Sequence, residues 1–251
     1  MSDRAEKIRL YVDAPLGAEE RISLAPPQAH YLNSVMRCQP GDSISVFNGS
    51  DGDWAARVVA GSRRSITLLC QVQTAPQRMP PDLWLVFAPL RKSRTDFVVE
   101  KATELGVRRI FPVRTEFTVA ARVSERRLQS HAIEAAQQCG ENHVPPVSGL
   151  QGLETVLDTW PAERQLLFCD EARMGRPVTD LTRFRTRKWA ILIGPVGGFS
   201  KTEASRIRSM PQSVPMSLGP RILRADTAAV AAIALWQASL GDWQRQSESA
   251  G

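Results

Sequence analysis

The stretch WAILIGPVGGFSKTE, residues 189–203, decides the class of fold. It opens with five apolar residues, Trp189 to Ile193, which predict a buried strand, and a glycine-rich turn follows. Ser200 and Glu203 then have the spacing of a capping box, which marks the start of a helix. Strand, glycine turn and helix are typical of ligand-binding connections in α/β proteins, because glycine lets the backbone approach a ligand. A tight connection without a ligand is an equally ordinary explanation.

Two common nucleotide-binding motifs do not fit this turn. A P-loop requires glycine immediately before its lysine, whereas two residues separate Gly198 from Lys201. The dinucleotide fingerprint GxGxxG fails as well, because Gly194, Gly197 and Gly198 are spaced GxxGG. The spacing therefore excludes both phosphate-binding interpretations.

A second informative segment, SLGPRILRADTAA at residues 217–229, comes one predicted helix later. We expect a short strand from Val214 to Leu218 that runs into this segment, and a helix from Ala228 to Leu240 that begins at its end. The alanines at the start of that helix make it thin, so its backbone can pack close to a neighbour. Asp226 has an ordinary role available as the N-terminal cap of the helix, and Arg224 as a surface cation.

Residues 1–74 predict a small β-barrel domain. Alternating segments at Ser43–Phe47, Trp54–Val59 and Ser65–Val72 are separated by turn sequences, and the Asn-Gly and Asp-Gly pairs at residues 48–52 are good hairpin signals.

One helix, Pro27 to Arg37, is expected to interrupt this barrel. Leu32, Val35 and Met36 recur at i, i+3 and i+4, which is the spacing of one helix face. The proline-rich residues 75–81 predict a linker.

Residues 82–251 alternate strands with helices, which predicts a largely parallel sheet covered on both faces. Besides the elements already described, the expected strands are Leu83–Ala88, Ile110–Val113 and Gln165–Cys169. One expected helix runs from Asp96 to Leu105 and is stopped by Gly106. A second is capped by Ser124 and ends at Cys139, before Gly140.

The composition sets broad limits on function. The chain has 251 residues, 43% of them hydrophobic, and its 32 Lys and Arg exceed its 26 Asp and Glu by 6. This excess favours a polyanionic partner, although many basic proteins bind no nucleic acid. The four cysteines and three histidines are scattered, so we expect neither a metal site nor a disulfide framework. Without an apolar leader or a long apolar segment, a cytoplasmic protein is expected.

Together, LIGPVGGFS (192–200) and SLGPRILRADTAA (217–229) closely resemble the signature of SPOUT-class RNA methyltransferases. The resemblance is specifically to the bacterial family that methylates N3 of a uridine in small-subunit (16S) ribosomal RNA. HYLNSVMRCQPGDSISVFNG (30–49) looks like its N-terminal PUA-like RNA-binding barrel, and FVVEKATELGVRRIFPV (97–113) and IEAAQQCGENHVPPV (133–147) are similar to its central blocks. The resemblance implies an α/β trefoil-knot domain, S-adenosylmethionine as cofactor and a homodimer.

The resemblance also implies which residues form the site. The backbone and apolar side chains that would cradle the cofactor are Leu192, Ile193, Gly194, Gly197, Gly198, Leu218, Gly219, Ile222 and Leu223.

Catalysis asks for removal of the N3 proton of uridine and for cations beside the developing anion. Arg224 and Arg221 are candidates for the anion, and Asp226 is a candidate for accepting the proton or orienting an arginine. For RNA docking we expect Arg9, Arg21 and Arg37 of the barrel, with Arg91, Lys92 and Arg94 of a loop after the first strand of the second domain. The target base must be unstacked to enter a catalytic pocket.

Three positions depart from the family pattern. Val196 stands where the family usually has Glu, and Phe117 and Glu141 stand where it usually has Arg. These departures keep two alternatives open. One is a methyltransferase of the same class that acts on another base or on a ribose 2′-hydroxyl; the other is a non-catalytic RNA-binding or ribosome-assembly factor with the same fold.

Overall fold

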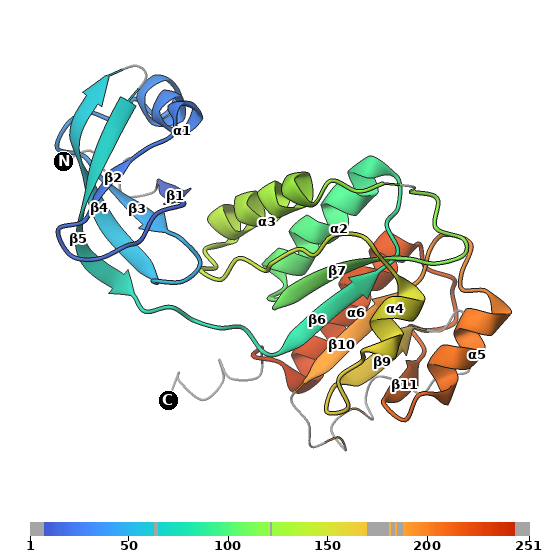
Figure 1. Cartoon of the computed structure of the whole chain (residues 1–251). Helices are drawn as coiled ribbons and strands as arrows, with labels where there is room; N and C mark the ends of the chain where they lie inside the picture. The colour runs from blue at the N-terminus through green and yellow to red at the C-terminus, as the bar shows by residue number, and fades with distance from the viewer. Residues whose placement is uncertain are drawn as a thin grey trace. The chain divides into compact units, whose positions relative to one another are not determined.

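The chain divides into two compact units (Figure 1). One consists of residues 1–79 and 136–144, and the other of residues 80–135 and 145–251. The computed structural model describes residues 8–62, 65–120, 122–169, 181, 184 and 188–243. Within these residues, no helix has both the length and the apolar character needed to cross a membrane.

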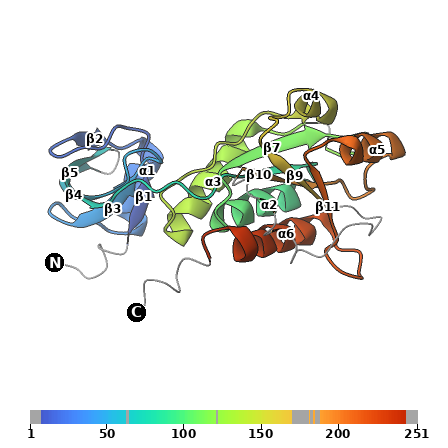
Figure 2. The same cartoon turned by 90° about the horizontal axis from the view of Figure 1, so that it is seen from below.

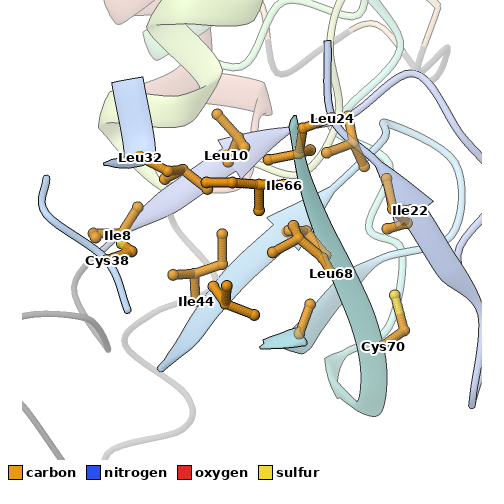
Figure 3. Close-up of a cluster of buried hydrophobic side chains, with 14 of the residues drawn as sticks. Ile8, Leu10, Ile22, Leu24, Leu32, Cys38, Ile44, Ile66, Leu68 and Cys70 are labelled. Carbon is orange, nitrogen blue, oxygen red and sulfur yellow. The ribbon is translucent and has the colours of Figure 1, made fainter. Parts of the chain in front are cut away.

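The first unit is a five-stranded sheet that curls around its own core, as expected for a small barrel. Its strands are β1 (Arg9–Tyr11), β2 (Arg21–Ser23), β3 (Ser43–Phe47), β4 (Asp53–Ser62) and β5 (Ser65–Ala75), in the order β1-β3-β4-β5-β2. β1 pairs with β3 in parallel, and the other pairs are antiparallel. Irregular register between β4 and β5 accentuates the curl. Figure 3 shows Leu10, Ile44, Ile66 and Leu68 among the buried side chains that meet inside.

The predicted helix of this unit differs from the expectation in its second half. α1 (Pro26–His30) runs directly into a π-helical turn, Tyr31–Val35, in which the amide of Met36 donates to the carbonyl of Tyr31. The wider turn rotates later side chains away from the face that a regular helix would present. Leu32 is fully buried but Val35 is 61% exposed, so the prediction that they share one face of a regular helix was wrong.

Residues 136–144 belong to the barrel unit through side chains that bond its backbone. Gln137 accepts a hydrogen bond from the amide of Tyr11 at 2.7 Å. Asn142 is 3% exposed, donates to the carboxylate of Asp53 at 2.9 Å and accepts from the amide of Arg78 at 3.0 Å. Gln137 and Asn142 of the QQCGEN sequence (137–142) therefore stabilise the barrel unit.

The second unit contains a six-stranded sheet in which every recorded pairing is parallel. Its strands are β6 (Leu83–Phe87), β7 (Arg109–Arg114), β8 (Gln151–Gly152), β9 (Gln165–Cys169), β10 (Trp189–Ile193) and β11 (Ser213–Met216), in the order β11-β9-β10-β6-β7-β8. From β6 the chain moves outward to β7 and β8, then returns to the other side, where β10 lies between β9 and β6. The trefoil knot stays a prediction, because residues 170–180, which follow β9, lie outside the described residues.

Helices cover both faces of this sheet (Figure 2). They are α2 (Lys92–Glu104), α4 (Leu153–Asp158), α5 (Lys201–Ser209) and α6 (Ala225–Leu240). α3 (Glu125–Cys139) pairs with α2 through Arg127 and Asp96, and its residues 136–139 belong to the barrel unit. α4 and α5 bury Leu153, Leu157 and Ile207 in one core with side chains of the sheet, and α2 and α6 pack together on the opposite face.

The helix boundaries confirm some expectations and correct others. Ser124 accepts from the amide of Arg127, and Gly140 follows α3 at a φ of 80°, as the cap predictions require. α2 begins at Lys92 instead of Asp96, so the predicted basic loop is the first turn of a helix. α6 begins at Ala225 instead of Ala228, so Asp226 lies inside its first turn and is not its cap.

Candidate functional site

A pocket of about 530 Å³ lies at the carboxyl ends of β6, β9 and β10. Pro89 and Leu90 line it just after β6, Cys169 at the end of β9, and residues 193–196 at the end of β10. The strand order changes direction between β6 and β10, and ligands of open α/β sheets bind at such a switch point. Both the position and the volume of the pocket suit a small-molecule ligand.

Aliphatic side chains form most of the wall: Leu90, Val119, Ile193, Val196, Ile222 and Leu223. Val119, Val196 and Ile222 are 72%, 72% and 76% exposed, and they come from three different connections. The charged lining residues, within the described part of the chain, are three arginines, Arg91, Arg94 and Arg224. The pocket therefore combines apolar walls with a cationic rim.

The glycine turn after β10 is shaped by a close aromatic neighbour. A Cβ on Gly194 would lie 2.7 Å from the ring of Phe199, so only glycine fits there without displacement. The amide of Gly198 donates to the carbonyl of Pro195 at 3.0 Å, and Gly198 has a φ of 75°. The turn then enters α5 through the predicted capping box of Ser200 and Glu203, which is confirmed.

An ion pair joins two helix starts beside the pocket. Asp226, in the first turn of α6, lies 3.5 Å from Arg94, in the first turn of α2. The Asp226 side chain is 18% exposed and that of Arg94 is 38% exposed. The carboxylate thus orients an arginine of the pocket wall, and that arginine is Arg94 instead of Arg221 or Arg224.

Cys169 contributes a neutral group to the pocket. Burial raises the pKa of its thiol to about 12, so the group stays protonated near neutral pH. A thiolate is the reactive form of cysteine, and nucleophilic catalysis by Cys169 is therefore disfavoured. Among the described residues, no group of three or more potential metal ligands comes together.

The structure brings a part of the sequence-predicted site residues into the pocket lining. Of the cofactor candidates these are Ile193, Gly194, Ile222 and Leu223, and of the catalytic candidates Arg224.

The other candidates of the two motif segments lie close by in the chain. Leu192 is buried inside β10, Gly197 and Gly198 continue the glycine turn, and Leu218 and Gly219 precede the loop to α6. Arg221 is exposed in that loop and is not part of the lining.

The candidate RNA contacts fall into two groups. Arg21, Arg37, Arg91 and Lys92 are exposed. Arg9 instead pairs with Asp53 at 2.8 Å, stacks on Phe47 at 3.7 Å, and donates to the carbonyls of Ala136 and Glu141. This geometry gives the Arg9 guanidinium a structural role within the barrel unit.

Sequence reasoning missed several lining residues. Val119 follows a predicted strand without any distinctive motif, and Pro89 and Leu90 carry no motif either. For Arg91 and Arg94 the sequence analysis predicts RNA contact only, although their place directly after a strand is a signal for the ligand edge of the sheet. The spacing of Glu203 predicts its capping role, but its second partner, the amide of Glu116 at 2.9 Å, is distant in sequence.

Comparison with known proteins decides the family. The sequence model of an RNA methyltransferase domain matches residues 77–237, and that of an RNA methyltransferase PUA domain matches residues 24–69. The chain belongs to the RNA methyltransferase family. A Rickettsia conorii relative named ribosomal RNA small subunit methyltransferase E is 27% identical over 230 residues, which cover 90% of this chain and 93% of the relative.

Solved structures resemble this RNA methyltransferase over nearly its whole length. The ribosomal RNA small subunit methyltransferase E of Neisseria gonorrhoeae, bound to S-adenosylmethionine, has a TM-score of 0.83 and 28% identity, covering 94% of this chain and 99% of that one. A Legionella pneumophila structure that holds the same cofactor has a TM-score of 0.82 and 26% identity, with 94% and 98% coverage. The fold of this chain is thus the SPOUT methyltransferase fold with an N-terminal PUA domain.

The three departures from the family pattern occupy different places in this RNA methyltransferase. Val196 lies in the pocket lining, so a neutral side chain replaces a charge there. Phe117 lies against the glycine turn, since a Cβ on Gly197 would be 3.5 Å from that of Phe117. The carboxylate of Glu141 accepts from the amide of His143 at 3.1 Å, within the barrel unit.

Proposed function

We propose that this protein transfers the methyl group of S-adenosylmethionine to N3 of a uridine in 16S ribosomal RNA. One observation carries the proposal: the two motif segments meet in a pocket at the switch point of the sheet. The surrounding chain resembles, over 94% of its length, a small-subunit RNA methyltransferase E that binds S-adenosylmethionine. The family supplies the class of reaction, and the names of the relatives supply small-subunit ribosomal RNA as the substrate. Uridine N3 as the target atom comes from the resemblance of the two motif segments.

The chemistry of the pocket fits the cofactor. Its volume of about 530 Å³ and its aliphatic lining suit an adenosyl group, and Gly194 keeps one wall free of a side chain. Ile193, Gly194, Ile222 and Leu223 would hold the cofactor directly, with Leu192, Gly197, Gly198, Leu218 and Gly219 shaping the two loops that carry them. When bound, S-adenosylmethionine supplies an electrophilic methyl group on a sulfonium.

The arginines at the rim suit the substrate side of the reaction. N3 of uridine is a weakly acidic imide, and loss of its proton places negative charge on the neighbouring carbonyl oxygens. We assign Arg224 to stabilising that charge, with Arg94 beside it, because both line the pocket. Asp226 holds Arg94 by the ion pair and is also a candidate proton acceptor. Arg221 is a second cation for the substrate, from the same loop as Arg224.

RNA docking is assigned to the exposed arginines and lysine on the two units. Arg21 and Arg37 would contact phosphates from the barrel unit, and Arg91 and Lys92 would do so from the start of α2, with Arg94 at the rim. Arg9 is left out of this set, because its guanidinium is engaged within the barrel unit. The pocket requires a base that is already unstacked or flipped out.

We also propose that the protein acts as a homodimer in the cytoplasm, where small ribosomal subunits are assembled. The alanine-rich α6 presents Leu235 at 41% exposure, and Trp243 after it is 49% exposed. Such large apolar side chains favour burial against a second copy. Light scattering coupled to gel filtration of the wild type and of Leu235→Glu measures this: a dimer that the substitution weakens is expected, and a monomeric wild type would contradict it.

Two experiments test the function. Nucleoside mapping by mass spectrometry of small-subunit RNA, from cells with and without the protein, should show the loss of one N3-methyluridine. Loss of another modified nucleoside would favour a different base or ribose target. Calorimetry with S-adenosylmethionine addresses the non-catalytic alternative, since a folded protein that shows no binding cannot be the proposed enzyme.

A further inference from the structure

Glu203 is a buried carboxylate that bridges two loops. It is 8% exposed and lies in the first turn of α5. One carboxylate oxygen accepts from the amide of Ser200 at 2.9 Å, and the other accepts from the amide of Glu116 at 2.9 Å. The first contact belongs to the glycine turn that follows β10, and the second belongs to the connection that follows β7. A single side chain therefore ties together two connections that are far apart in sequence.

Both connections reach the pocket. The glycine turn contributes Gly194 and Val196 to the lining, and the connection after β7 contributes Val119. Residues 115–118 form a tight turn directly before Val119, because the amide of Thr118 donates to the carbonyl of Thr115 and the amide of Thr115 donates to the hydroxyl of Thr118. A rigid turn of this kind passes the position of Glu116 on to Val119.

We propose that Glu203 is a positioning residue for the cofactor pocket, acting by fixing the two connections that bring Val119 and Val196 to the lining. The proposal rests on the proposed function, because it takes the ligand to be S-adenosylmethionine. Glu203 lies outside the pocket lining and acts only through the two loops. Besides the hydrogen bond between Glu116 and Glu203, Phe117 also lies against the glycine turn, 3.5 Å from a Cβ built on Gly197.

Helix capping alone is the competing explanation, and a conservative substitution separates the two roles. A capping box accepts Glu or Gln at this position, because one oxygen suffices for the N-cap amide. In Glu203→Gln that oxygen can still accept from Ser200, but an amide NH₂ would then face the amide of Glu116, and two donors cannot bond. Ser200→Ala makes the reverse change, because it removes the cap hydroxyl that the Glu203 amide uses and leaves the bond to Glu116 intact.

The experiment compares the two variants with the wild type. Glu203→Gln should bind S-adenosylmethionine about tenfold more weakly by calorimetry, because a buried amide loses its acceptor in the loop that shapes the pocket. Its KM for the cofactor should rise by a similar factor while kcat changes little. Ser200→Ala should lower the melting temperature and leave cofactor affinity near that of the wild type. Equal cofactor affinity in Glu203→Gln and the wild type would overturn the proposal.

A measurement on the wild type covers the case in which Glu203→Gln does not fold. If cofactor binding requires the hydrogen bond between Glu116 and Glu203, then bound cofactor must in turn stabilise that bond. Saturation with S-adenosylmethionine should therefore slow hydrogen exchange at the Glu116 amide. Unchanged exchange at that amide on saturation with S-adenosylmethionine would also overturn the proposal. A wild-type protein that does not bind S-adenosylmethionine at all would instead contradict the proposed function, so the two failures are distinguishable.

Discussion

The two ends of the central strands in the second unit use arginine in opposite ways. At the amino ends of β6 and β10, Arg164 is 4% exposed and donates to the carboxylate of Asp82 at 2.9 Å and to the carbonyl of Trp189 at 2.9 Å. Its guanidinium also lies 3.5 Å from the ring centre of Trp84. At the carboxyl ends, Arg91 and Arg224 are exposed beside the pocket.

The difference separates stability from function within one sheet. A buried charge with several partners is costly to disturb but is not available to a ligand. Exposed arginines above apolar walls contribute little to the folded state and are free to meet an anion. Substitutions at the amino ends should therefore change unfolding, and those at the carboxyl ends should change binding and turnover.

Removal of Arg164 should have the largest effect. Arg164→Met leaves Asp82 without its closest cation in a partly buried place, so the free energy of unfolding should fall by about 3–5 kcal/mol. Urea denaturation measures this change. Asp82→Asn in the same background should restore a part of it, because it removes the uncompensated charge. Arg91→Ala should stay within about 0.5 kcal/mol of the wild type, and a similar loss in both arginine variants would break the comparison.

Arg224 should show the opposite pattern. Arg224→Ala removes a cation proposed to stabilise the developing anion, so single-turnover methylation should slow by about 10² to 10³-fold. Affinity for S-adenosylmethionine, measured by calorimetry, should change far less, and so should the urea midpoint. Arg206→Ala is a suitable control, because Arg206 pairs with Asp158 on the face of the sheet that α5 covers. Unchanged turnover in Arg224→Ala would remove this residue from the mechanism.

Substitution of Gly194 tests whether the glycine turn, at the carboxyl end of β10, is rigid. Gly194→Ala forces the ring of Phe199 to move, and overpacking of this kind costs about 1–3 kcal/mol of unfolding free energy. It should also weaken cofactor binding. Gly197→Ala, in the same turn, meets Phe117 only at 3.5 Å and should be tolerated. Phe199→Leu should restore part of the stability that Gly194→Ala loses. Equal unfolding free energies and cofactor affinities of the two alanine variants would show that the turn adapts.

The sequence predicted those parts of the fold that depend on neighbouring residues. β9 and β10 have the predicted bounds, because each contains a run of at least four apolar residues that ends at a polar residue or a glycine. The capping box at Ser200 and the stop at Gly106, with a φ of 73°, are local for the same reason. The alternation of strands with helices was sufficient for the parallel sheet, since it needs no knowledge of register.

Long-range contacts account for most of what sequence reasoning did not find. The partner of Asp226 is Arg94, and nothing in either local sequence relates the two. Glu203 has the spacing of a cap, but its bond to Glu116 arises only when two connections meet. The π-helical turn at Tyr31–Val35 was missed because its apolar spacing is compatible with an ordinary helix.

Salt dependence of RNA binding should give the smallest effect and the finest test of the two ends. Each phosphate contact contributes about 0.7 to 0.9 to the slope of log affinity against log salt concentration. Arg91→Ala, at the carboxyl end, should reduce the slope by one such increment. Arg109→Ala, at the exposed start of β7, should not, although it removes the same charge. An equal loss of slope in Arg91→Ala and Arg109→Ala would mean that RNA binding depends on the overall charge of the unit. The pocket alone would then distinguish the two ends in function.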